Sequence, residues 1–258
     1  MYDLQKASML KRVSAYILDL ILILILIVGA AWGLASALDF DGYQTRLDEI
    51  KSEYLTEYNV NPDKDKDGLV STEEYAALTD AEKAAYAAAD EAFSKNEEAI
   101  HCYSMMLSLA LLITSLSILA SFLILEFAVP LIFGNGQTVG KKIFSIAVMH
   151  TNGTRVRTVS MFIRTLLGKY TVETMIPVII ILMLMFSNAG AVGVLLLFAI
   201  LALELILPLA TSLHSCLHDL IASTVTVDLA SQMIFDSTEE LLEYKKRIHR
   251  EAAEKKTY

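Results

Sequence analysis

An apolar stretch near the start of the chain, interrupted by a single charge, constrains the fold more than any other feature. Val13–Leu34 comprises 22 residues and contains one charged residue, Asp19. A helix of about 20 residues crosses the ~30 Å hydrocarbon core of a bilayer, so this segment is predicted to span a membrane. A carboxylate at this depth is unfavourable unless it is paired, protonated or in contact with water. Arg12 lies on the same helical face but leans toward the N-terminus, so Asp19 is expected to find its partner on another helix.

Three further apolar stretches predict a bundle of four transmembrane helices and an all-α fold class. Hydrophobic residues make up 55% of the 258 residues, too large a share for an ordinary soluble domain. The expected spans are Val13–Leu34, about Tyr103–Phe133, about Tyr170–Ser187 and about Gly190–Leu213, with the last two joined as a tight hairpin. The chain is thereby divided into six segments. They are an N-terminal segment with the first span (1–38), an outer insertion (39–104), a second span (105–133), an inner loop (134–169), a hairpin of spans (170–214) and a C-terminal segment (215–258).

Charge is distributed unevenly along the chain, and this distribution predicts its orientation. The net charge is −9, but residues 39–98 hold 17 acids against 6 bases, whereas residues 134–169 hold 6 bases and no acid. Lys and Arg are retained on the cytoplasmic side of a membrane. Both termini and the basic inner loop are therefore expected inside, and the acidic, helical insertion outside. A bacterial plasma membrane is the expected location.

The outer insertion contains a run of acids with the spacing of an EF-hand calcium loop. The expected ligands are Asp63, Asp65, Asp67, the Leu69 carbonyl, Ser71 and Glu74. Gly68 permits the sharp turn that such a loop needs. The sequence therefore predicts Ca²⁺ binding, at the weak affinity of about 10⁻⁴–10⁻³ M that suits an outer surface. The alternative is an acidic loop without metal, and Pro62 leaves both a lone calcium loop and a regular EF-hand open.

Helices are expected on both sides of this loop and at the C-terminal end of the chain. Asp48–Tyr58 and Thr72–Phe93 have helical composition, with a possible new cap at Thr79, and a capping-box pattern opens a helix from Ser237 to about Lys256.

The inner loop has the pattern of a small β-hairpin followed by an amphipathic helix. Ile143–His150 is predicted to be a strand, Asn152-Gly153 a tight turn and Arg155–Val159 the returning strand. Ser160–Lys169 resembles an interfacial helix whose Arg164 and Lys169 meet lipid phosphates. The alternative is that these bases only anchor the loop inside.

Three glutamates within the predicted spans each precede a proline by four residues: Glu126 and Pro130, Glu173 and Pro177, Glu204 and Pro208. A helical proline cannot donate to the carbonyl four residues earlier, so each proline frees the carbonyl of the glutamate itself. A carboxylate and a free carbonyl are ligands for hard cations, and interrupted helices supply them in transporters. The alternative is a kink whose gap is filled by water or by Ser and Thr.

The depth of each acid predicts a binding layer within the bilayer. Asp19 lies ~10 Å inside the start of the first span, and Glu126 a similar distance from the inner end of the second. The two are predicted to form a cation- or proton-binding layer, with Glu204 as the next position toward the outside. Near the inner end of the fourth span, His218 is expected to accept protons or hydrogen bonds, and Asp219 to pair with Arg12.

Several of these patterns together resemble the RDD family of small membrane proteins. The first span carries Arg-x-x-Ala-x-x-x-Asp, the inner loop carries Gln137–Lys142, and Leu217–Thr224 follows the last span. The family takes its name from one arginine and two aspartates, which correspond here to Arg12, Asp19 and Asp219. The resemblance implies a multi-pass membrane architecture. It also implies a molecular function that is mostly unassigned, with transport commonly suspected.

Two functions fit these features. One is a secondary transporter that exchanges protons for monovalent cations through buried carboxylates, as a homo-oligomer because four spans are few. The other is a membrane accessory or signalling protein whose calcium loop senses conditions outside the cell. The sequence contains no nucleophile, phosphate cradle or nucleic-acid patch above background, so neither an enzyme nor a nucleic-acid partner is expected.

Overall fold

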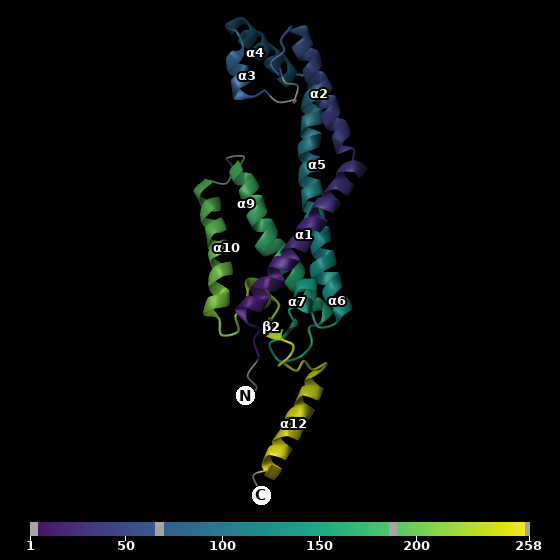
Figure 1. Ribbon diagram of the computed structural model, residues 1–258, viewed down its shortest axis with the longest axis vertical. Coiled ribbons are helices and arrows are strands. Elements are labelled where there is room, and N and C mark those ends of the chain that lie inside the picture. Colours follow the sequence, from purple (N-terminus) through teal and green to yellow (C-terminus); the bar gives the residue numbers. More distant parts are fainter. Residues whose placement is uncertain (1–4, 65–69, 186–189, 256–258) are drawn as a thin grey trace. The chain divides into compact units, whose positions relative to one another are not determined.

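A computed structural model of the chain describes residues 5–64, 70–185 and 190–255. It divides into two compact units, one formed by Met1–Ile27 with Ile118–Tyr258 and the other by Val28–Ser117 (Figure 1).

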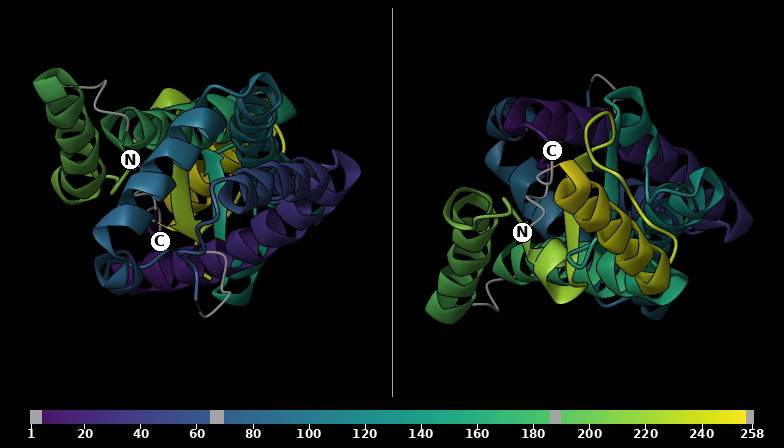
Figure 2. Two further views of the ribbon diagram at one scale, coloured as in Figure 1. Left: turned by 90° about the horizontal axis from the view of Figure 1, so that it is seen from above. Right: turned by 90° about the horizontal axis from the view of Figure 1, so that it is seen from below.

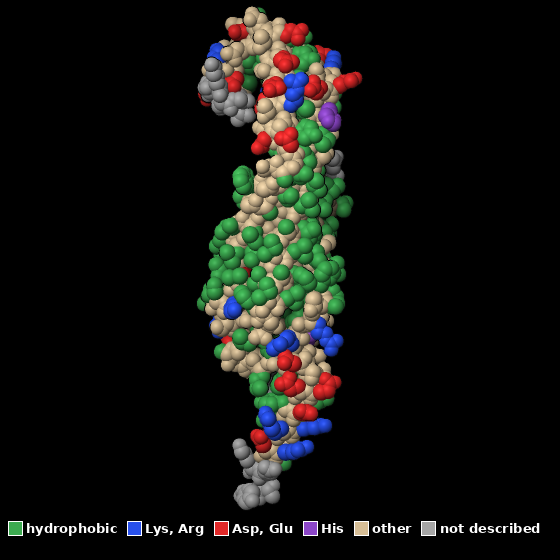
Figure 3. Space-filling view, turned by 90° about the vertical axis from the view of Figure 1, so that its right-hand side faces the viewer, with side chains coloured by type: hydrophobic (Ala, Val, Ile, Leu, Met, Phe, Trp, Pro, Cys, Tyr) green, Lys and Arg blue, Asp and Glu red, His purple; other side chains and the backbone are tan. Residues whose placement is uncertain are grey.

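Four helices among the described residues are long and apolar enough to span a membrane, which confirms the number of spans predicted. They are α1 (Met9–Ala37); α5 (Glu97–Phe122) continued by η1 (Leu123–Ala128) and α6 (Val129–Phe133); α8 (Thr158–Phe162) continued by η2 (Ile163–Met175) and α9 (Ile176–Met185); and α10 (Gly190–Ala210). The exposed surface of the spans is hydrophobic, as contact with lipid requires (Figure 3). The helices α9 and α10 lie side by side as the predicted hairpin (Figures 1 and 2).

The second unit contains the predicted outer helices, here α2 (Phe40–Glu57), α3 (Thr72–Ala77) and α4 (Asp80–Ser94), and acidic side chains gather over it (Figure 3). Packing between α2 and α4 brings the rings of Tyr54 and Phe93 to 6.4 Å between centroids, and Asn96 donates to the Tyr54 hydroxyl at 3.1 Å. Ser71 caps α3, and Thr79 caps α4 as expected, each within a complete capping box.

The third span is unusual because its central part, η2, is a π-helix of 13 residues. Threonine hydroxyls support the wider turn: Thr171 donates to the carbonyl of Leu166 at 2.7 Å, and Thr174 to that of Lys169 at 2.9 Å. Each of these bonds reaches five residues back, the spacing of π-helical bonding. π-Helices of this length are rare, and shorter ones often lie at functional sites.

The π-helical winding decides which side chains share a face. Nine residues separate Arg164 from Glu173. In an α-helix this is two and a half turns, which would place the two side chains on opposite faces. With roughly 4.4 residues per turn in a π-helix, nine residues make about two turns, so both side chains lie on one face. That face meets the short helix α11 (Leu217–Ile221), where Arg164 and Glu173 both find partners.

Gly168 allows α11 to approach η2 closely. A Cβ atom added at Gly168 would lie 2.5 Å from the Cβ and 2.8 Å from the Cα of His218. Real Cβ atoms do not tolerate such distances to backbone atoms, so either α11 or η2 would have to move. The absence of a side chain at this position is therefore a condition of the packing.

A small sheet collects three segments that are far apart in the sequence. Strand β1 (Ile146–His150) pairs antiparallel with β2 (Thr224–Asp228), with Ile146 opposite Asp228. The N-terminal segment adds to β2, since Asp228 N–H donates to the Gln5 carbonyl at 3.0 Å and Ala7 N–H to the Thr226 carbonyl at 3.4 Å. The core of the sheet is fully buried and consists of Ala147, Met149, Val225 and Val227.

The predicted hairpin between 143–150 and 155–159 is therefore wrong. Asn152-Gly153 does turn, with Gly153 at φ 93°, but Arg155 contributes a single isolated bridge to Met149. The strand that pairs along β1 is β2, because its alternation places Val225 and Val227 opposite Met149 and Ala147. The burial of these apolar side chains outweighs the local turn signal.

The predicted interfacial helix Ser160–Lys169 is also wrong as a separate element. Its residues belong to α8 and η2, which continue directly into α9. Arg164 and Lys169 are 1% and 8% exposed, so they are inside the protein rather than at lipid phosphates. By contrast, the predicted C-terminal helix is present as α12 (Thr238–Lys255).

We predict that Gly168→Ala lowers the free energy of unfolding by about 1–3 kcal/mol through overpacking against His218. The matched control is Gly33→Ala in α1, where an added Cβ meets nothing within 4 Å. Because alanine favours a helix by roughly 0.5–1 kcal/mol over glycine, the control is expected to be neutral or stabilising. Thermal melting of both variants in detergent measures the difference, and equal stability would contradict the close packing at Gly168.

Candidate functional site

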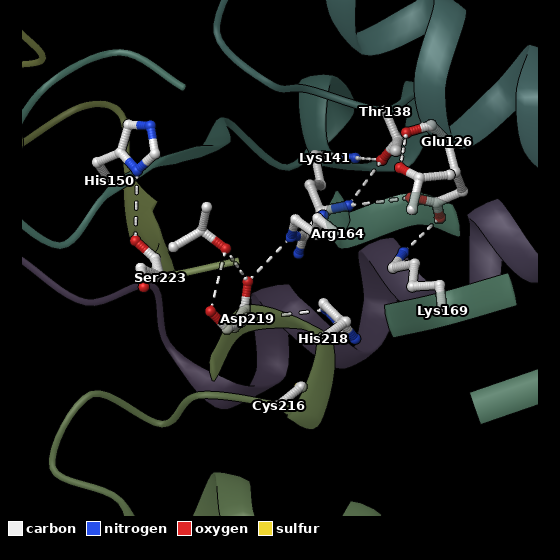
Figure 4. Close-up of polar contacts among 12 residues, drawn as sticks. Glu126, Thr138, Lys141, His150, Arg164, Lys169, Cys216, His218, Asp219 and Ser223 are labelled. Carbon is white, nitrogen blue, oxygen red and sulfur yellow. Dashed lines mark hydrogen bonds and ion pairs between the residues drawn. The ribbon is translucent and has the colours of Figure 1, made fainter. Parts of the chain in front are cut away.

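Ionisable side chains from α1, η1, η2, α11 and α7 (Val139–Ile143) meet inside the first unit. Figure 4 shows those of η1, η2, α7 and α11. We call the whole set the buried charge cluster. Its four acids are Asp19, Glu126, Glu173 and Asp219, and its four bases are Arg12, Lys141, Arg164 and Lys169, with His218 beside them. The formal charges cancel when His218 is neutral. Burial makes that balance necessary, because an unpaired charge away from water is strongly unfavourable.

Asp219 lies between two arginines and is fully buried. Arg164 Nε donates to its Oδ1 at 3.0 Å, the Thr224 hydroxyl to the same oxygen at 2.9 Å, and Arg12 Nη2 lies 3.5 Å from Oδ2. Burial alone would raise the pKa of Asp219, but Arg164, His218 and Arg12 outweigh it and hold that pKa well below its usual range. The structure thus places Arg12 against Asp219 as expected, and adds Arg164 as the closer partner.

His218 and Glu173 join the third span to α11. The backbone N–H of His218 donates to Glu173 Oε1 at 2.8 Å, and His218 Nδ1 lies 2.8 Å from both carboxylate oxygens. Burial, followed by the charge of Arg164, lowers the pKa of His218, which favours the neutral ring at pH 7. The sequence leaves Glu173 open as a cation ligand or as part of a structural polar network, and here its carboxylate accepts a hydrogen bond from α11.

Asp19 finds its partners on α7 rather than on its own helix. Thr138, the N-cap of α7, donates its hydroxyl to Asp19 Oδ2, and Gly140 N–H donates to Oδ1 at 2.7 Å. A Cβ atom at Gly140 would overlap the carbonyl oxygen of Ala15 in α1. Gly140 therefore lets α7 approach α1 closely enough to reach the Asp19 carboxylate.

Glu126 lies in the second span and is held by two lysines from other elements, Lys169 of η2 and Lys141 of α7. Lys169 Nζ lies 2.6 Å from Oε1, and Lys141 Nζ lies 4.0 Å from Oε2. Lys141 also donates to the Thr138 hydroxyl at 3.3 Å, so Thr138 and Lys141 connect Asp19 to Glu126. Burial and then repulsion from Lys169 lower the pKa of Lys141 to about 8. The two acids predicted to share a layer are thus brought into one network.

Some polar atoms of the spans have a hydrogen-bond partner and others have none among the described residues. The carbonyl that Pro130 frees at Glu126 accepts the Thr165 hydroxyl at 2.8 Å, so here a threonine fills the gap. Within the described residues, Glu126 Oε2, Arg164 Nη1 and Glu204 Oε1 are buried without a hydrogen-bond partner. Glu204, on α10, takes part in none of the ion pairs of the buried charge cluster that the described residues form.

Cys216, His218 and Asp219 place possible metal-ligating atoms within 4.8 Å of one another. The arrangement does not suit a cation, because Asp219 already pairs with Arg164 and Arg12, and Arg12 Nη2 lies 3.6 Å from the Cys216 sulfur. The structure therefore favours an ion-pair role for Asp219.

The predicted calcium loop is described only in part. Asp65, Asp67 and Leu69 lie outside the described residues, as does Gly68. Glu74 accepts hydrogen bonds from Lys64 N–H at 2.9 Å and from the Ser71 N–H and hydroxyl at 2.9 Å each. Calcium binding through these residues and Asp63 stays a prediction.

Sequence reasoning missed the cluster roles of four residues: Thr138, Lys141, Arg164 and Lys169. The signal that points to them is charge matching. Residues 134–169 contain bases without acids, while the four spans predicted from the sequence contain acids and no base. Buried acids require cations, and the inner loop and the start of the third span supply them.

Four apolar spans enclosing a balanced set of buried charges define a multi-pass integral membrane protein. The RDD family model matches residues 6–223, and the chain belongs to this family. Arg12, Asp19 and Asp219, the residues behind the resemblance in sequence, all lie in the buried charge cluster. Neither a curated protein nor a solved structure matches the chain.

A double-mutant cycle is expected to show strong coupling between Arg164 and Asp219 and weaker coupling between Arg12 and Asp219. Removing one partner of a buried pair leaves an uncompensated charge, at a cost of about 3–5 kcal/mol, whereas exposed pairs contribute roughly 0.2–1 kcal/mol. The control is the exposed pair Arg155–Asp236, which has the same 3.0 Å separation. Melting of single and double alanine variants in detergent gives the coupling energies, and additive effects at Arg164 and Asp219 would contradict the assignment.

Proposed function

We propose that this RDD family protein is a secondary transporter that exchanges protons for a monovalent cation through the buried charge cluster. One observation carries the proposal. Glu126 lies inside a membrane span, 2% exposed, and its Oε2 makes no hydrogen bond with any described residue. An ionisable residue at this depth is by default a candidate for an ion or proton pathway.

The charge balance supplies the physical basis for exchange. With four acids and four bases, the buried charge cluster is neutral, so a further cation leaves an unbalanced positive charge in a low-dielectric interior. Loss of one proton from the Lys141 ammonium to water, as the cation enters, restores neutrality. Asp19 and Glu126 form the exchange layer, and Glu204, whose Oε1 is buried and without a hydrogen bond within the described residues, is the next position along the path. A homo-oligomer, and an orientation with both termini in the cytoplasm of a bacterial cell, belong to this proposal.

The wild-type protein in proteoliposomes is expected to show Na⁺ or K⁺ flux that depends on a pH gradient. Asp19→Asn and Glu126→Gln should each abolish this flux, because each removes a negative charge on which the balance depends. Glu243→Gln on α12, an exposed acid outside the spans, is the control and should leave the flux unchanged. A wild type that moves neither cation under any gradient, or full flux in both cluster variants, would rule out transport. The accessory function would then be the better account.

We also propose that the outer loop binds Ca²⁺ through Asp63, Asp65, Asp67, the Leu69 carbonyl, Ser71 and Glu74, which is the feature that favours a sensing role. The ligand spacing around Gly68 supports this second proposal.

Calorimetry on the full-length protein in detergent should detect Ca²⁺ binding that Glu74→Gln weakens at least about tenfold, because a bidentate ligand is lost. Glu82→Gln is a matched control. Glu82 forms the same capping box with Thr79 that Glu74 forms with Ser71, so it separates loss of a helix cap from loss of a ligand. Equal binding heats for the wild type and Glu74→Gln would exclude the site.

A further inference from the structure

We propose that the ammonium group of Lys141 is a tethered cation, and that a monovalent cation of the Na⁺ or K⁺ class takes its place among the oxygens of Asp19, Thr138 and Glu126. The inference rests on the proposed exchange function and assigns the cation a position and a competitor. It adds Thr138 as a ligand and Lys141 as the group that the cation displaces.

Two oxygens near Lys141 Nζ come from different elements, Thr138 at the N-cap of α7 and Glu126 on η1, and Asp19 of α1 is bonded to the Thr138 hydroxyl. Thr138 donates its hydroxyl proton to Asp19, so its lone pairs are left to accept, and one of them accepts from Lys141 Nζ at 3.3 Å. Glu126 Oε2 lies 4.0 Å from the same nitrogen (Figure 4). Hydroxyl and carboxylate oxygens are the ligands that hard cations prefer. A cation that replaces Nζ and lies closer to Glu126 Oε2 than Nζ does would contact these oxygens directly.

Glu126 Oε2 shows that the ammonium fills this position incompletely. The Glu126 side chain is 3% exposed, and Oε2 has no hydrogen-bond partner in the described part of the chain. A buried acceptor left without a partner costs about 1–3 kcal/mol, which an ion in contact with Oε2 recovers. The missing hydrogen bond therefore points to a ligand that approaches Glu126 more closely than Lys141 does.

The two lysines beside Glu126 differ in how tightly they are held. Lys169 contacts Oε1 at 2.6 Å, a short charge-assisted bond, whereas Lys141 lies 4.0 Å from Oε2 and makes a long bond to Thr138. Lys141 also sits on a helix of five residues outside the four spans, on a side chain with a flexible four-carbon stem. Lys141 is therefore the base that can leave, and Lys169 the one that stays.

Charge selects the class of cation. The buried charge cluster holds four acids and four bases, so withdrawal of one ammonium leaves a net charge of −1. A monovalent cation restores neutrality, while a divalent cation would leave an excess positive charge in a buried site.

The test is the melting temperature of full-length Lys141→Met in detergent, in NaCl or KCl against choline chloride at equal ionic strength. Without the competing ammonium, Na⁺ or K⁺ should raise the melting temperature by about 3–5 °C at ten times the dissociation constant. The wild type should show a smaller rise. Lys142→Met is the matched control, because Lys142 is exposed and lies over the Phe133 ring instead, and it should behave as the wild type does. Identical melting of Lys141→Met in all three salts overturns the proposal.

If Lys141→Met does not fold, the wild type decides the question through modification by an amine-reactive reagent, read by mass spectrometry. Na⁺ or K⁺ should increase modification of Lys141 but not of Lys142, and choline should change neither. No cation-dependent increase at Lys141 overturns the proposal. Flux measurements separate this result from transport. A wild type that moves no cation while Lys141→Met is stabilised refutes the exchange function alone, and flux without any cation effect at position 141 refutes the tethered cation alone.

Discussion

The contact between Asp219 and Arg164 joins parts of the chain that would otherwise have no reason to meet. Asp219 is fully buried, and Arg164 is 1% exposed, so neither charge has water as an alternative partner. Arg12 of α1 reaches the same carboxylate, which ties the first span to the third through α11. Strand β2 begins five residues after Asp219, and the Thr224 hydroxyl donates back to it. The sheet is thus anchored to the same point, and loss of the Asp219 charge removes contacts of α1, η2 and β2 at once.

The π-helical winding of η2 gives this helix a single polar face that packs against α11. It places Arg164 and Glu173 on the side of α11, and Gly168 between them leaves room for the His218 backbone. Lys169, the neighbour of Gly168, reaches Glu126 on the second span. An α-helix of the same sequence would direct Arg164 and Glu173 to opposite faces, and one of the two charges would point at lipid. The winding therefore follows from the need to pair every charge on the third span.

Hydropathy and charge bias suffice to predict the four spans, and the depth argument at Asp19 suffices to predict that its partner lies elsewhere. The pairing of Arg12 with Asp219 is also accessible from their opposite charges and similar depth. The roles of Arg164 and Lys169 cannot be predicted in this way. A 3.6-residue period makes Ser160–Lys169 look like a surface helix, and the sequence contains no recognised signal for a π-helix there. The partner of β1 is missed for a related reason. Local turn chemistry at Asn152-Gly153 is visible in the sequence, whereas the long-range burial of Val225 and Val227 depends on the packing of the whole unit.

The two ends of the buried charge cluster are satisfied to different degrees, and this difference bears on function. At Asp219, Arg164, Thr224 and Arg12 surround the carboxylate, so no position is left for a ligand. At Glu126, one oxygen is bonded to Lys169, while the other lies 4.0 Å from Lys141 and has no hydrogen bond within the described part of the chain. A site that exchanges ions must release what it holds, so a fully satisfied carboxylate serves structure and a half-satisfied one serves exchange. In the proposed exchange, the pairing at Asp219 would keep η2 in place while the contacts of Glu126 change. The proposed exchange layer would then work without the helices separating each time an ion moves.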